Sequence, residues 1–179
     1  MANSSAVGFG LRPIRKVGQN DNNNGLTEYD VAASSAAMYQ NDGVEAQNTG
    51  KIAIGAEGDT LIGSLNGVFF TDATTNKPTF ANNLAASNTA TDIVAFVNDD
   101  PYQMFEIRSD NTGASDASDV FNNADINVTA GDATTNGISK STLKDSTLTG
   151  GGTGTPIIFS WTLSAGTWYH LALTRDTSN

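Results

Sequence analysis

The sequence contains no cysteine, and this absence removes several kinds of chemistry. Without thiols the chain has no disulfide, no thiol nucleophile and no thiolate metal site. Histidine is nearly absent as well, because His170 in "TWYHLAL" is the only one. A Ser-His-Asp triad or a zinc site would have to use it, and no nucleophile motif accompanies it. We therefore expect a protein that is not an enzyme, with no catalytic residue, no cofactor and no bound metal.

Basic residues and long hydrophobic runs are also scarce. Nine Lys and Arg stand against nineteen Asp and Glu, which gives a formal net charge of −10. An acidic surface repels phosphate groups and so disfavours a nucleic-acid partner. No run approaches the roughly 20 apolar residues that span a bilayer, and the first residues lack the apolar segment of a signal peptide. These absences predict a soluble protein made in a cytoplasm, with no membrane partner.

The residues that are abundant, Gly, Asn, Thr, Ser and Ala, are typical of a loop-rich β protein. Strand-sized apolar runs alternate with turn residues, and no long helical pattern separates them. The pattern predicts an all-β fold: a compact β-sandwich or a small β-barrel, with a jelly roll among the candidate topologies. Asn66-Gly67 predicts a hairpin turn. An Ala-rich stretch at residues 29–42 is the one candidate for a helix.

Composition divides the chain into four segments. We expect an extended N-terminal arm at residues 1–25, a β body at 26–148, a Gly-rich break at 149–156, and a C-terminal β-hairpin at 157–179 that completes the sheet. The arm has isolated apolar anchors among Gly and Pro, and it ends in the polar tract "QNDNNNG". That tract lacks the ligands of a calcium loop. The alternative is that residues 8–17 form the first strand of the body itself.

The stretch "IVAFVNDDPYQMFEI", residues 93–107, predicts a β-hairpin. Its candidate core contacts place one strand against the other: Ile93, Ala95 and Val97 against Phe105 and Ile107.

The connection of this hairpin contains Asp99, Asp100 and Pro101. Paired carboxylates can bind calcium or hydrolyse glycosides when a fold holds them together. An Asp side chain also closes turns, because it accepts a hydrogen bond from the backbone two residues on. Proline cannot donate to a sheet ladder, so Pro101 should lie in the turn or on an edge. With no histidine, cysteine or ligand set nearby, we interpret these residues as a turn or an interface.

Four stretches occur in an order that carries a resemblance: "FGLRPIRKVG", "GVFFTDATTNKPTF", "DIVAFVNDDPYQMFEI" and "GDATTNGISKSTLKDS". Over about residues 8–148 the chain resembles a group of small structural proteins of tailed bacteriophages, commonly found in marine phages. The resemblance implies a capsid decoration (cement) protein on the outer surface of the virion, made in the host cytoplasm. The tail departs from this pattern, because "GTWYHLALTRDTSN" is similar to the central strands of laminin-G-like sandwiches.

The implied partners are the major capsid protein and further copies of the chain, as a trimer or dimer. Phe69 or Phe70, if exposed, could serve contacts between copies. In the arm, apolar side chains would dock in grooves or by strand addition, and basic ones would pair with acidic shell residues. These capsid-contact candidates are Phe9, Leu11, Arg12, Ile14, Arg15 and Lys16. Several weak contacts would together give high avidity.

A second function comes from another class: a carbohydrate-binding module of a phage fibre or adsorption apparatus. Trp161, Trp168 and Tyr169 would be its stacking platforms. Alternatively, these aromatic side chains fill the face of a sheet. A hydrolase that uses the Asp cluster would need an acid-base pair, and the sequence offers none that can be identified.

Overall fold

The computed structural model describes residues 7–17, 25–32, 35–110, 119 and 122–148. The predicted Gly-rich break and C-terminal hairpin lie outside these residues, and so do the tract at 18–24 and the side chains of Trp161, Trp168, Tyr169 and His170. The body predicted for residues 26–148 is therefore described almost completely.

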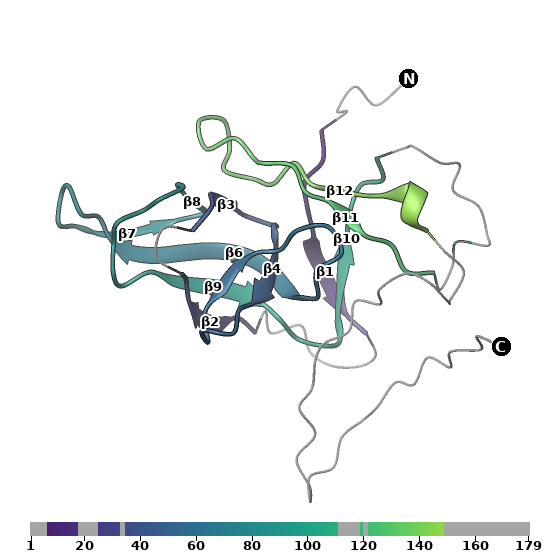
Figure 1. Ribbon diagram of the computed structural model, residues 1–179, viewed down its shortest axis with the longest axis horizontal. Coiled ribbons are helices and arrows are strands. Elements are labelled where there is room, and N and C mark those ends of the chain that lie inside the picture. Colours follow the sequence, from purple (N-terminus) through teal and green to yellow (C-terminus); the bar gives the residue numbers. More distant parts are fainter. Residues whose placement is uncertain (1–6, 18–24, 33–34, 111–118, 120–121, 149–179) are drawn as a thin grey trace, which may run out of the picture.

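The fold is all-β, as predicted, and its strands are short (Figure 1). The elements are β1 (Arg12–Lys16), β2 (Thr27–Asp30), β3 (Met38–Tyr39), β4 (Gly43–Ala46), β5 (Ile52–Ile54), β6 (Leu61–Thr71), β7 (Pro78–Ala81), β8 (Asn83–Leu84), β9 (Val94–Asn98), β10 (Gln103–Glu106), β11 (Ile126–Asn127), β12 (Thr142–Leu143) and the 3-10 helix η2 (Asp145–Thr147). The Ala-rich stretch contains the end of β2 and all of β3, so the helix prediction is wrong for its described residues.

The largest sheet has six strands in the order β2-β9-β6-β4-β5, with β7 also paired to β6. Strand β6 is eleven residues long and runs straight through the predicted Asn66-Gly67 turn. That prediction is wrong because β6 pairs with β9 on both sides of this dipeptide. Leu65 faces Val97 and Gly67 faces Phe96, so the extra residue forms a bulge.

The hydrophobic core lies between this sheet and the two-stranded sheet β3–β8. Met38 of β3 and Leu84 of β8 are fully buried together with Leu65, Val68 and Val97 of the larger sheet. Two layers therefore enclose one core, which is the sandwich arrangement. The described strands do not close into a barrel.

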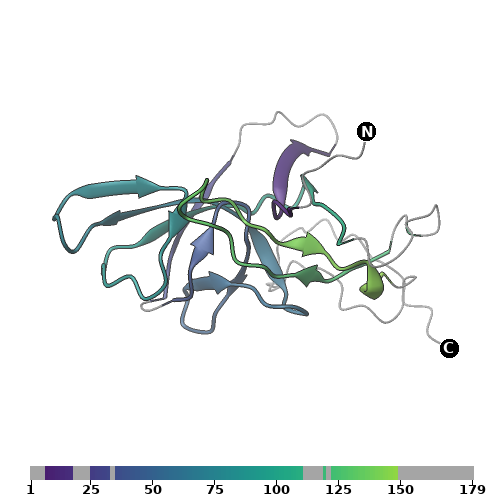
Figure 2. The same cartoon turned by 90° about the horizontal axis from the view of Figure 1, so that it is seen from above.

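The predicted hairpin of residues 93–107 is wrong, although both of its strands exist. Strand β9 lies between β2 and β6, so both of its edges are already paired. Strand β10 pairs instead with β1, outside the larger sheet (Figure 2). The core contains Ile93, Ala95 and Val97, as predicted. Phe105 in β10 and Ile107 just after it are only half-buried and lie outside this core.

The N-terminal segment at residues 8–17 belongs to the body of the protein. The Gly10 amide donates to the carbonyl oxygen of Ser141 (3.0 Å), and the Leu11 amide donates to the carbonyl oxygen of Asn41 (2.8 Å). Strand β1 then pairs antiparallel with β10. For these residues the structure shows the second of the two expectations, a first strand of the body in place of a free arm.

Gly10 provides a test of how closely this segment is held. Its φ is +70°, and a Cβ there would lie 2.2 Å from the carbonyl oxygen of Asn41. Gly50 has a similar φ of +75°, and a Cβ there would have nothing within 4 Å. Substituting Gly50 therefore measures the cost of the positive φ alone. We expect Gly10→Ala to lower the free energy of unfolding by about 3 kcal/mol and Gly50→Ala by about 1 kcal/mol. Urea denaturation measures both, and equal losses would contradict this packing.

Candidate functional site

The apolar contact candidates at the start of the N-terminal segment are used within the protein. Phe9 is half-buried, and the guanidinium of Arg12 lies 4.8 Å from the centre of its ring. Leu11 is also half-buried, and its carbonyl oxygen accepts a hydrogen bond from Ser64 Oγ (2.6 Å). The ring contact of Phe9 and the backbone hydrogen bond of Leu11 therefore lie within the protein itself.

Two of the three basic candidates form ion pairs with acids of the same chain. Arg12 pairs with Glu106 across β1 and β10, and both side chains are exposed. Lys16 Nζ lies 2.6 Å from Asp100 Oδ2, and only 7% of the Lys16 side chain is exposed. The Asp100 side chain is 27% exposed, so the pair is partly buried. An exposed pair contributes little to stability, whereas a partly buried pair is screened less. Lys16 is therefore a structural residue.

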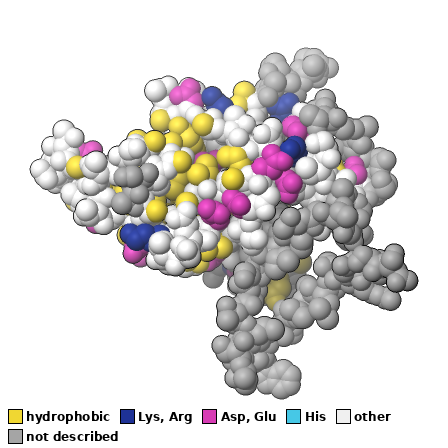
Figure 3. Space-filling model, viewed as in Figure 1, with side chains coloured by type: hydrophobic (Ala, Val, Ile, Leu, Met, Phe, Trp, Pro, Cys, Tyr) yellow, Lys and Arg dark blue, Asp and Glu magenta, His cyan; other side chains and the backbone are white. Residues whose placement is uncertain are grey.

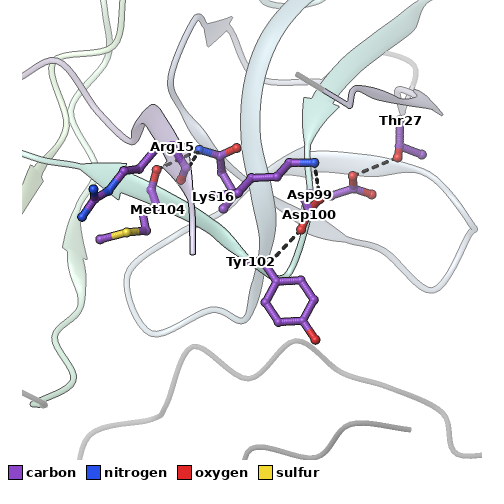
Figure 4. A network of polar contacts seen from close by, with 8 residues as sticks. Arg15, Lys16, Thr27, Asp99, Asp100, Tyr102 and Met104 are labelled. Atoms are coloured by element: carbon purple, nitrogen blue, oxygen red, sulfur yellow. Dashed lines mark hydrogen bonds and ion pairs between the residues drawn. The ribbon is translucent and has the colours of Figure 1, made fainter. Parts of the chain in front are cut away.

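The outward side of β1 and the adjoining turn carry a mixed apolar and basic strip. Pairing with β10 shifts by one residue between Pro13 and Arg15, so Ile14 has no partner on β10. Ile14 is 46% exposed, Val17 54% and Tyr102 46%, and the Val17 amide donates to the Tyr102 carbonyl. Figure 4 shows that the Arg15 side chain and the Tyr102 ring point away from the polar network. We call Ile14, Arg15, Val17 and Tyr102 the β1 strip.

Asp99 attaches the β9–β10 connection to β2. Its carboxylate accepts hydrogen bonds from Thr27 Oγ1 (2.8 Å) and from the Tyr29 hydroxyl (2.6 Å). Burial, the hydrogen bond to Asp99 and the negative charge of Asp99 together raise the pKa of Tyr29 to about 12. The tyrosine therefore stays protonated and remains a donor across the physiological pH range.

Asp100 attaches the same connection to β1 (Figure 4). Besides the Lys16 pair, its Oδ1 accepts the amide of Tyr102 (2.8 Å), and its carbonyl oxygen accepts the amide of Gln103 (2.9 Å). The first of these bonds is the Asp turn that the sequence suggested. The hydrogen bond from Lys16, followed by the Tyr102 amide, lowers the pKa of Asp100. Pro101 is exposed in this turn, where its lack of an amide proton has no cost.

The polar groups of this connection are thus occupied by donors from the protein itself. Across the described residues, no three His, Cys, Asp or Glu side chains come together in a way that could hold a metal ion. The same part of the chain has no helix long and apolar enough to cross a membrane. Two hollows among the described residues, one beside Asp42 and one beside Asp59, are small, with a volume of about 10 Å³ each.

A second surface is aromatic, and the sequence reasoning named Phe69 but missed the other two rings. Phe69 of β6 faces Phe80 of β7, and Gly67 of β6 faces Phe96 of β9, so the three rings share the outer face of the larger sheet. Phe80 is 64% exposed and Phe69 38%, and the ring centres of Phe80 and Phe96 are 5.6 Å apart. Of the two residues expected to be exposed, Phe70 is buried in the core. We call Phe69, Phe80 and Phe96 the aromatic face.

The pentapeptide "DATTN" occurs twice, at residues 72–76 and 132–136, and it folds in a similar way both times. Asp72 Oδ1 accepts the amide of Thr75 (2.7 Å), and Asp132 Oδ1 accepts the amide two residues on (2.9 Å). The amide and hydroxyl of Thr75 lower the pKa of Asp72, and the hydroxyls of Thr134 and Thr135, followed by the Thr134 amide, lower the pKa of Asp132. The repeat is a turn-forming unit, and it could have been found by comparing the sequence with itself.

Comparisons with known proteins found no match for this chain among protein-family models, curated proteins or solved structures.

The Lys16–Asp100 pair predicts a pH dependence of stability. Because the folded-state pKa of Asp100 lies below its ordinary value of 3.8, this pair stabilises the fold above that pH and is lost as the pH falls through the lowered pKa. We expect Asp100→Asn to reduce the free energy of unfolding by about 1–2 kcal/mol at pH 7. The free energy of unfolding of this variant should also fall less than that of the wild type as the pH is lowered. Urea denaturation from pH 7 to pH 2 measures this.

Lys16→Met and the double variant complete a thermodynamic cycle for this pair. A coupling free energy near zero between the two positions would contradict the structural role given to it.

Proposed function

We propose that this protein is a virion structural protein that decorates the outer surface of a phage head and stabilises the shell. The observation that carries the proposal is the β1 strip. There Ile14, Val17 and Tyr102 expose apolar surface around Arg15, on a chain whose net charge is −10. Exposed apolar side chains beside an arginine are typical of surfaces that bind other proteins. The partner would be the major capsid protein, through an acidic and apolar region of its surface.

The charge distribution supports docking at this strip. Acidic side chains lie at several places among the hydrophobic ones on the face seen in Figure 3, and basic side chains are few. Arg15 is exposed, and it lies close to two further basic residues that are balanced by Glu106 and Asp100. A basic position on an acidic molecule favours one orientation of approach and disfavours the others.

The support beneath the strip also suits a cementing role. Asp99 and Asp100 tie the connection to β2 and β1, so Tyr102 and the adjoining strand are held in place before binding. A surface that is already ordered loses less conformational entropy when it binds. Two or three copies joined as a dimer or trimer would engage several shell subunits at once, which raises the effective concentration of each contact.

Sedimentation with undecorated heads tests the proposal. We expect wild-type protein to bind heads at a fixed copy number and Arg15→Glu to weaken binding about tenfold or more, because it removes the charge that the acidic shell surface would attract. Lys77→Glu is the matched control. It makes the same change in charge at an exposed position in the β6–β7 connection, away from the strip, and it should bind as wild type does.

Two results would contradict capsid decoration through this strip. One is the absence of saturable binding by the wild-type protein. The other is equal weakening by Arg15→Glu and Lys77→Glu, which would mean that only net charge matters.

A second function, a carbohydrate-binding module, is favoured by the aromatic face. Rings that lie open on a sheet can stack against the apolar faces of sugars. We expect a glycan array to show binding that Phe80→Ala abolishes without changing the free energy of unfolding by more than about 1 kcal/mol, since Phe80 is mostly exposed. Tyr102→Ala, an exposed aromatic residue in the β1 strip, is the control and should retain binding. An array with no bound glycan would remove this second function.

A further inference from the structure

Asp42 is a carboxylic acid placed inside the protein. Its side chain is fully buried, with 0% of the residue exposed. Oδ2 accepts the amide of Tyr39 (2.8 Å), whereas Oδ1 has no hydrogen-bond partner. An ionised carboxylate in such a place has lost its hydration without an equivalent replacement, which favours the neutral acid. Neither the β1 strip nor the aromatic face makes use of this group.

The residues just before Asp42 join separate parts of the fold. The carbonyl oxygen of Asn41 accepts the amide of Leu11 (2.8 Å), which holds the N-terminal segment. The carbonyl oxygen of Gln40 accepts the amide of Ser139 (2.8 Å), which holds the connection between β11 and β12. Asn41 reaches this position with a φ of 72°. Movement of the turn at Asp42 would therefore disturb both attachments together.

The groups around Asp42 are uncharged. Burial raises its pKa to about 6, and the Ser139 hydroxyl and the Tyr39 amide oppose that rise only in part. The shallow hollow beside it is lined by glycine, alanine, aliphatic residues and Ser141, with Asp42 as its one ionisable residue. From β6, the backbone of Leu65 binds the backbone of Asp42 (2.9 Å) and brings no charge. No cation among these groups would compensate the ionised form.

We propose that Asp42 is a pH-sensitive latch, which in its neutral form holds the N-terminal segment and the β11–β12 connection against the larger sheet and which loosens both when it ionises. In the neutral form the buried Oδ1, which has no hydrogen-bond partner, carries no net charge, so its burial costs less. Ionisation places a negative charge in this buried position, next to the carbonyl groups that hold Leu11 and Ser139.

The direction of the effect follows from the raised pKa. A group whose pKa is higher in the folded state stabilises the fold below its unfolded value of 3.8, and this contribution is lost as the pH rises through about 6. The attachment should therefore be tighter at pH 5 than at pH 8. Because Leu11 leads directly into β1, the position of the β1 strip would respond to the same proton.

Amide hydrogen exchange, corrected for the intrinsic pH dependence, tests the latch in the full chain. For the wild-type protein we expect protection of the Gly10, Leu11 and Ser139 amides to fall about tenfold or more between pH 5 and pH 8. The amide of Val68, which lies in the central strand β6 between β7 and β9, serves as the internal reference for global stability. In Asp42→Asn the protection of the three amides should no longer depend on pH, since the amide side chain keeps an acceptor for Tyr39 and does not ionise.

A second measurement covers the case in which Asp42→Asn does not fold. The carboxyl carbon of Asp42 in the wild-type protein, followed by NMR, should titrate with a midpoint near 6, and Ser139→Ala should raise that midpoint because it removes a hydrogen bond to the ionised form. A midpoint below 4, or protection that is constant from pH 5 to pH 8 in the wild-type protein, would overturn the proposal.

Discussion

The position of β9 between β2 and β6 is the constraint on which the rest of the structure depends. A strand has two edges, and both edges of β9 are paired. The chain that follows must therefore leave the sheet after Asn98, although its sequence is that of a good hairpin strand. It finds a partner in β1, and this pairing makes the N-terminal segment part of the body. The β1 strip exists because that strand is held at the side of the molecule.

Acidic side chains provide much of the local order that disulfides or prolines provide in other small β proteins. Asp72 and Asp132 each organise a "DATTN" loop, and Asp100 organises the exit from β9. Carboxylates that accept several backbone hydrogen bonds stay ionised well into acid. Asp42 is the exception, because its surroundings favour the neutral form. One residue type thus stabilises turns at the surface and, in the proposed latch, makes a junction in the interior depend on pH.

The aromatic face and the β1 strip belong to different sheets. The aromatic face belongs to the six-stranded sheet and reaches β7 at one end of the molecule, while the β1 strip lies on the smaller sheet at the other side (Figure 1). A protein that binds a shell through one surface would leave the other available for a second contact, to another copy or to a glycan. The proposed latch would make the position of the β1 strip relative to the larger sheet depend on pH.

The sequence by itself determined the all-β class, the strands on either side of Asp99 and Asp100, and the inward positions of Ala95 and Val97, because alternation of apolar and polar residues is a local property. The turn made by Asp100 is local too, since its donor lies two residues along the chain. Only the tertiary structure decided which strands pair. Asn66-Gly67 is a bulge because β6 has partners on both edges, and Phe69, Phe80 and Phe96 form one face because register brings three strands together. Such pairings depend on which edges are still free, and no short stretch of sequence carries that information.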